Sequence, residues 1–144
     1  MNRLSSRSAA RTGTALVSAA AIVLLAGCTS AQNKPVENYA GEPKGVDAPA
    51  SSAGGASWAT WLERGDQFAI VLYGSSTCPP EVASVSVIAD NQLKATLAPA
   101  PGGICTRDYV PHTTVFTTPS RVTTSSEVTI ALPDATLTMP GLRG

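Results

Sequence analysis

Residue types that form a hydrolase triad occur within one part of the chain. Ser75 or Ser76 could be the nucleophile, His112 the base and Asp108 the group that orients the base. Neither serine lies in a Gly-x-Ser-x-Gly elbow, and the chemistry needs a base held within hydrogen-bond reach of the nucleophile. The alternative is that the serines shape a turn and Asp108 caps it or pairs with an arginine. We therefore expect no catalytic residue.

Two of the three cysteines, Cys78 and Cys105, form an even pair once Cys28 is assigned to the leader segment described below. Such a pair in a small exported domain predicts a disulfide, which the chain-entropy argument values at about 3–4 kcal/mol. The other interpretation is a reactive or metal-binding thiol pair. The chain has no Cys-x-x-Cys motif and a single histidine, so we expect neither a metal nor a cofactor.

The predicted disulfide would join two polar loops, and loops held on a rigid scaffold are common places for binding sites. We expect the contact residues to lie on these loops, at Ser75, Ser76 and Thr77 on one and at Arg107, Asp108 and Tyr109 on the other. Trp58 and Trp61 are a second candidate, as a stacking platform or partner anchor. The alternative for the tryptophans is that they cover the open end of a sandwich.

Short apolar or alternating runs, separated by Gly and Pro, predict strands in the part of the chain that carries these residues. The run 67–73 predicts a central strand with Phe68, Ile70 and Leu72 on one face and the alternate residues on the other. Further strands are expected over 81–89, 92–97, 112–118, 127–132 and 135–139, and residues 58–62 are either a strand or a helical turn.

No segment has a convincing helical period, so six or seven strands predict an all-β fold for residues 58–144. We expect a small antiparallel β-sandwich of immunoglobulin-like size, with an open barrel as the alternative. Antiparallel pairing is favoured because parallel strands need crossover connections, which are usually helical.

The first 27 residues have the layout of a secretory signal peptide. Arg3, Arg7 and Arg11 precede an apolar run that ends at Ala26, and this run is short for a spanning helix. The run is followed by Gly27 and Cys28, and Leu25-Ala26-Gly27-Cys28 resembles the lipobox of bacterial lipoproteins. The resemblance implies a diacylglycerol on the Cys28 sulfur, cleavage just before it, and a protein anchored to the cell membrane and facing outward.

Residues 28–57 are rich in Pro, Gly, Ser and Ala, and they predict a flexible linker between the anchor and the domain. As a coil this linker would have a reach of ~30 Å. The full chain has ten acidic and ten basic residues, and removal of the leader leaves seven basic residues and a net charge of −3. A mildly acidic chain lacks the basic surface that nucleic acid requires, so we expect no nucleic-acid partner.

The motifs Gly74-Ser75-Ser76-Thr77-Cys78-Pro79 and Cys105-Thr106-Arg107-Asp108-Tyr109 are similar to a pattern in small exported actinobacterial proteins of unknown function. That resemblance implies no activity and no site residue. The function that we expect is a non-enzymatic binding or interaction module of the cell envelope, with the membrane and an envelope protein or glycan as partners. The alternatives are a small envelope hydrolase, an inhibitor-like regulator and a passive spacer.

Overall fold

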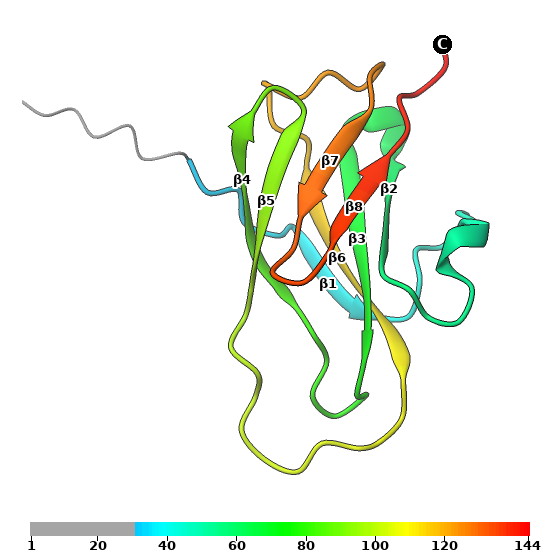
Figure 1. Ribbon diagram of the computed structural model, residues 1–144, viewed down its shortest axis with the longest axis vertical. Helices are drawn as coiled ribbons and strands as arrows, with labels where there is room; N and C mark the ends of the chain where they lie inside the picture. The colour runs from blue at the N-terminus through cyan, green and yellow to red at the C-terminus, as the bar shows by residue number, and fades with distance from the viewer. Residues whose placement is uncertain (1–30) are drawn as a thin grey trace, which may run out of the picture.

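The computed structural model describes residues 31–144, and it consists of two four-stranded β-sheets packed face to face (Figure 1). The predicted leader and Cys28 lie outside the described residues. The eight strands are β1 (Glu37–Ala40), β2 (Trp58–Leu62), β3 (Gln67–Gly74), β4 (Val82–Ala89), β5 (Gln92–Leu97), β6 (Val110–Thr117), β7 (Val128–Ala131) and β8 (Thr136–Met139). Two short 3-10 turns, η1 (Ala50–Ser52) and η2 (Glu63–Gly65), precede β2 and β3. The predicted all-β sandwich is confirmed.

The first sheet has the strand order β1-β6-β3-β2, and all its pairs are antiparallel. Its inner face contributes Phe68, Ile70 and Leu72 to the core, as the run 67–73 predicted. Phe68 stacks on Phe116 with ring centroids 5.5 Å apart, and Trp61 meets Phe68 edge-on at 6.4 Å. Each such aromatic pair stabilises the fold by about 0.5–1.5 kcal/mol beyond the gain from burying its apolar surface.

The second sheet has the order β4-β5-β7-β8, with Val128 and Ile130 buried on its inner face. The expectation of purely antiparallel pairing is wrong for one pair, because β5 and β7 are parallel. The chain leaves β5, crosses to the other sheet as β6 and then returns as β7, so a strand of the opposite layer replaces the helical crossover that the prediction required.

Residues 33–57 belong to the folded domain, so the prediction of a flexible linker over 28–57 is wrong for this part. Asn33 exchanges two backbone hydrogen bonds with Val85 of β4, at 2.8 and 2.9 Å. Four residues later the same segment forms β1, which pairs with β6 in the other sheet. Strand β1 pairs with an otherwise free edge of β6, and the hydrogen bonds of this pairing offset the entropy lost when the segment is ordered.

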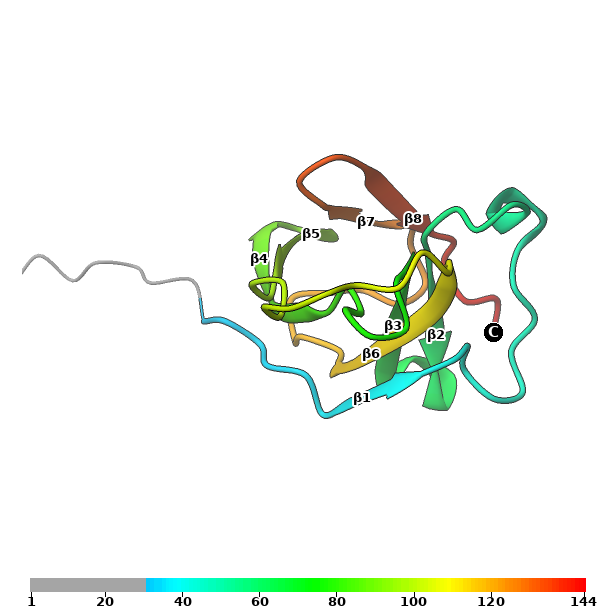
Figure 2. The same ribbon diagram turned by 90° about the horizontal axis from the view of Figure 1, so that it is seen from below.

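Residues 41–57, which we call the strap, run from β1 to β2 outside the first sheet, as the end view shows (Figure 2). The hydroxyl of Thr113 donates to the Gly41 carbonyl at 2.6 Å, and Tyr73 donates to the Glu42 carboxylate. Beneath the strap, Ala69 and Val71 on the outer face of β3 have no exposed surface. The strap therefore covers the sheet face that a two-layer sandwich would leave in water.

Candidate functional site

A disulfide joins Cys78, in the loop after β3, to Cys105, in the loop before β6, with the two Cα atoms 5.4 Å apart. The predicted disulfide is therefore confirmed. Both loops extend beyond the same end of the sandwich (Figure 1). The loop between β5 and β6 is long and almost entirely exposed, so the disulfide ties it to the rigid end of β3.

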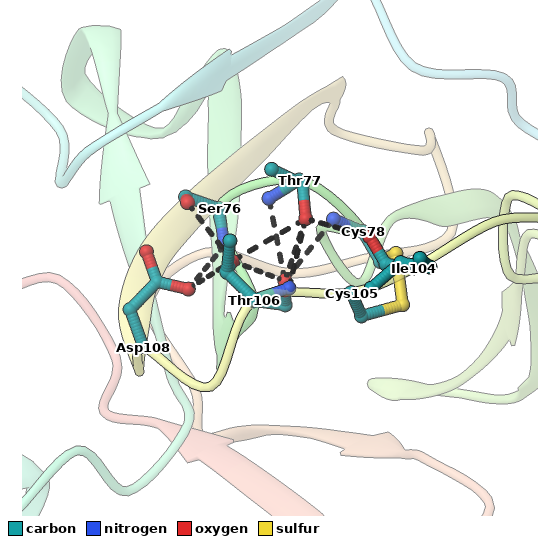
Figure 3. The surroundings of a disulfide bond; sticks show 8 residues. Ser76, Thr77, Cys78, Ile104, Cys105, Thr106 and Asp108 are labelled. Carbon is teal, nitrogen blue, oxygen red and sulfur yellow. Dashed lines mark hydrogen bonds between the residues drawn. A yellow bond between two sulfur atoms is a disulfide. The ribbon is translucent and has the colours of Figure 1, made fainter.

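The hydroxyl of Thr106 is the centre of a hydrogen-bond network between the two loops (Figure 3). Its oxygen lies 2.8 Å from the hydroxyl of Ser75 and 3.2 Å from that of Ser76. The backbone N–H of Thr106 donates to the hydroxyl of Thr77 at 3.0 Å, and that hydroxyl donates to the Ile104 carbonyl at 3.5 Å. The three hydroxyls of Ser75–Thr77 thus bind the partner loop, so their role is to position the loop pair.

Asp108 completes this network as an ionised carboxylate. Its Oδ1 accepts hydrogen bonds from the Thr106 hydroxyl and, at 3.0 Å, from the backbone N–H of Ser76. Hydrogen bonding by Ser76 and then by Thr106 lowers the pKa of Asp108 from 3.8 to about 2. The carboxylate is exposed, so the site presents a fixed negative charge to solvent at neutral pH.

The structure does not assemble the residue types of a triad. The Nε2 of His112 lies 2.7 Å from the amide oxygen of Asn38 and 3.7 Å from a carboxylate oxygen of Glu81. Asp108 receives its hydrogen bonds from the other loop, and Ser75 is bonded to Thr106. His112 thus links β6 to β1 and to the start of β4, which is a structural arrangement.

The outward side of the two loops forms a surface that we call the loop patch, made of residues 75–77 and 104–109. Ile104 is 97% exposed and Tyr109 is 63% exposed, and Arg107 is also exposed. The inner side of Tyr109 stacks on Tyr73 with ring centroids 5.7 Å apart, and its hydroxyl donates to the Gly55 carbonyl at 3.2 Å. Tyr109 therefore fixes the loop patch to the strap as well as to the sheet.

The two tryptophans do not form an exposed platform, so that expectation is corrected. Trp58 is 4% exposed and Trp61 is 9% exposed. Trp61 faces the core between the sheets and donates from its indole nitrogen to the Pro140 carbonyl at 2.8 Å. Trp58 is buried on the other face of β2, outside this core. Both faces of the first sheet are therefore covered. The sequence did not predict that the strap covers the outer one.

A cleft of about 720 Å³ lies between the strap and the outer face of the first sheet. Its lining includes residues from all four strands of that sheet, from the strap and from η2. Sequence reasoning missed it because Glu37, Tyr39 and Lys44 were assigned to a flexible linker. The sequence carries little signal for it, because Val36-Glu37-Asn38-Tyr39 has two adjacent polar residues and does not alternate.

The wall formed by η2 has an unusual backbone. Glu63 and Arg64 have φ values of 45° and 55°, in the left-handed region that is costly for residues with a Cβ atom. Both residues line the cleft. Residues held in such conformations are found preferentially at functional sites, where the surrounding structure maintains them.

Comparison of the chain with protein-family models, curated proteins and solved structures finds no match in any of the three. Within residues 31–144, no group of three or more His, Cys, Asp and Glu side chains is arranged as a metal site. The same residues contain no helix of sufficient length and apolar character to cross a membrane. The lipobox and the similarity of the loop motifs to exported actinobacterial proteins stay predictions.

Proposed function

We propose that the chain is a lipid-anchored protein of the cell envelope that acts as a non-enzymatic binding module, with the loop patch as its contact surface. The observation that carries this proposal is the 97% exposure of Ile104 next to a disulfide-bonded cysteine. A large apolar side chain on a fixed loop loses little conformational freedom when a partner covers it. An exposed apolar residue at such a position therefore favours a binding surface.

The residues around Ile104 support an envelope protein as the partner. Arg107 and Tyr109 are of types that are enriched among the residues that dominate the binding energy of interfaces. Asp108 adds a negative charge whose position is fixed by the hydrogen bonds of Ser76 and Thr106. An apolar group surrounded by charges of both signs suits a partner surface with an apolar pocket and a polar rim.

The proposed anchor places the domain near the lipid surface. Asn33 is held against β4, so only five residue steps separate it from Cys28. A fully extended chain covers ~3.5 Å per residue, which limits this distance to about 18 Å. The domain would therefore lie closer to the membrane than the ~30 Å reach of a flexible linker over 28–57 implies.

Cross-linking in cells, followed by mass spectrometry of the tagged full-length protein, tests the binding function. We expect one envelope protein to be cross-linked to the wild type and lost with Ile104→Ser. The matched control is Ile88→Ser, which changes a half-exposed isoleucine on β4, away from the loop patch. A wild type without any specific partner, or a partner retained equally by both variants, would contradict the proposal and favour the passive spacer.

A further inference from the structure

The cleft between the strap and the first sheet is a binding site separate from the loop patch. We propose that it takes a short peptide that carries a free ammonium group and a free carboxylate. Its volume of about 720 Å³ lies within the range of ~300–1,000 Å³ that is typical of small-ligand sites. This proposal is independent of the lipid anchor and of a partner for the loop patch.

Four charged side chains line the cleft, two acidic and two basic. Glu37 comes from β1, Lys44 from the strap, and Glu63 and Arg64 from η2. The two ion pairs found among residues 31–144 join His112 to Glu81 and Arg121 to Asp90, so none of these four charges has an ionic partner in the described part of the chain. Equal numbers of both signs disfavour a polyanion or a polycation and favour a ligand that carries both charges.

Three of the four charges come from the two edges of the sheet. Glu37 lies on β1 and η2 follows β2, and these strands are the opposite edges of the sheet. Three strand spacings of ~4.8 Å separate the edges, which gives about 14 Å. An extended tripeptide spans about 10 Å, and the long side chains of Lys44 and Arg64 can cover the remaining distance.

The floor between the two ends suits the middle of a peptide. Val115 of β6 and Leu62 of β2 both line the cleft, and Leu62 is partly exposed, so the floor offers apolar contact to a ligand side chain. Gln67 also lines the cleft, and a glutamine side chain carries both a donor and an acceptor for a peptide bond. Tyr39 adds an aromatic ring at the β1 end, and its pKa is raised by burial and then by the neighbouring Glu37.

The walls are held in place without a ligand. Glu63 and Arg64 are fixed in left-handed backbone conformations, and the N–H of Asp66 donates to the Glu63 carbonyl to close the turn. On the opposite side, Gly41 is bonded to Pro111 and Thr113. A site that is already formed does not spend binding energy on ordering, which favours a small ligand.

The test is an NMR titration of the ¹⁵N-labelled full-length protein in detergent with a pool of Ala-Xaa-Ala tripeptides in which the middle residue is varied. We expect the free peptides to change the chemical shifts of the backbone amides of Gln67 and Val115. The N-acetylated pool and the C-amidated pool should each bind at least tenfold more weakly than the free pool. Arg64→Gln is expected to reduce the preference for the free carboxylate, and Glu37→Gln the preference for the free ammonium group.

Arg121→Gln, outside the cleft, is the matched control and is expected to bind like the wild type. Absence of shifts with the free pool would overturn the proposal, as would equal binding of the free and blocked pools. Glycerophosphoethanolamine distinguishes a zwitterionic lipid headgroup from a peptide. If glycerophosphoethanolamine changes the chemical shifts of the Gln67 and Val115 amides and the tripeptides do not, the site binds a lipid headgroup and the peptide proposal is wrong.

Discussion

Thr106 and Asp108 take part in most of the side-chain hydrogen bonds that join the two loops of the loop patch. Thr106 donates to Asp108 and receives hydrogen bonds from the serines of the other loop. The types of these residues were visible in the sequence, and so was the cysteine pair that brings them together. Their hydrogen-bond partners could not be predicted, because a serine or threonine hydroxyl can bond to any nearby polar group and the sequence does not tell which loops are adjacent.

The hydrogen bonds of Asp108 predict a specific loss of stability in acid. Its pKa in the folded protein is about 2, below the ordinary value of 3.8. The carboxylate therefore contributes stability that is complete above the ordinary pKa and is lost as the pH falls through about 2. We expect Asp108→Asn to be less stable than the wild type at neutral pH, and the difference to disappear as the pH approaches 2.

Urea unfolding at a series of pH values measures this effect. Asp134→Asn, at the exposed turn between β7 and β8, is the control and should show no such convergence. A difference between Asp108→Asn and the wild type that stays constant from neutral pH to pH 2 would show that the carboxylate is not held as the structure describes.

Among the elements, the strands of the sandwich were predictable and the segment 33–57 was not. The run 67–73 has apolar residues on both faces, and it is indeed a central strand buried on both sides. Strand β1 has only four residues and follows a proline-containing stretch, so its own sequence hardly distinguishes it from a coil. It becomes a strand because β6 presents a free edge, which is information that lies elsewhere in the chain.

Asn38 tests whether β1 is a structural part of the sheet. Its amide oxygen accepts from His112 Nε2 at 2.7 Å and from the Thr114 hydroxyl at 3.2 Å. We expect Asn38→Ala to reduce the free energy of unfolding by about 1 kcal/mol, because these partly buried donors lose their acceptor. Gln32→Ala, at an exposed position just before Asn33, should leave it unchanged in the same urea titration. An equal effect of both variants would contradict the pairing of β1 with β6.

The disulfide is the strongest single link between two elements outside the core. It closes a loop with a sequence separation of 27 residues. We expect the double variant Cys78→Ala/Cys105→Ala to lose about 3–4 kcal/mol of unfolding free energy, mostly through a less restricted unfolded chain. Differential scanning calorimetry of the variant, and of the wild type with reductant, measures this loss of unfolding free energy. A loss below about 1 kcal/mol would mean that the loop pair is held by its hydrogen bonds alone.

For the whole molecule, the composition indicated a small exported all-β domain, and the class of fold was correct. The extent of the domain was not, because Gly and Pro in residues 41–57 indicate irregular backbone but do not tell whether that backbone packs on a sheet. Here it does, since Tyr73 and Tyr109 bond to Glu42 and Gly55 of the strap. The cleft arises from this packing, so no local motif could have predicted it.

The proposed anchor predicts that Cys28→Ser releases the protein from the membrane. Two or more acyl chains hold a protein stably at a bilayer. Residues 31–144 contain no helix that is long and apolar enough to cross one. We expect the wild type in the membrane fraction and the variant in the soluble fraction after cell lysis and centrifugation. Retention of Cys28→Ser in the membrane fraction would contradict lipid anchoring.

The central claim is that the loop patch contacts an envelope protein, and photo-cross-linking from position 104 tests it most directly. A photoreactive amino acid at this position replaces a side chain that is 97% exposed, so the fold should tolerate it. The same group at position 88, on β4, is the control. We predict that one defined envelope protein is cross-linked from position 104 and not from position 88. No product at 104, or the same products from both positions, would contradict the claim.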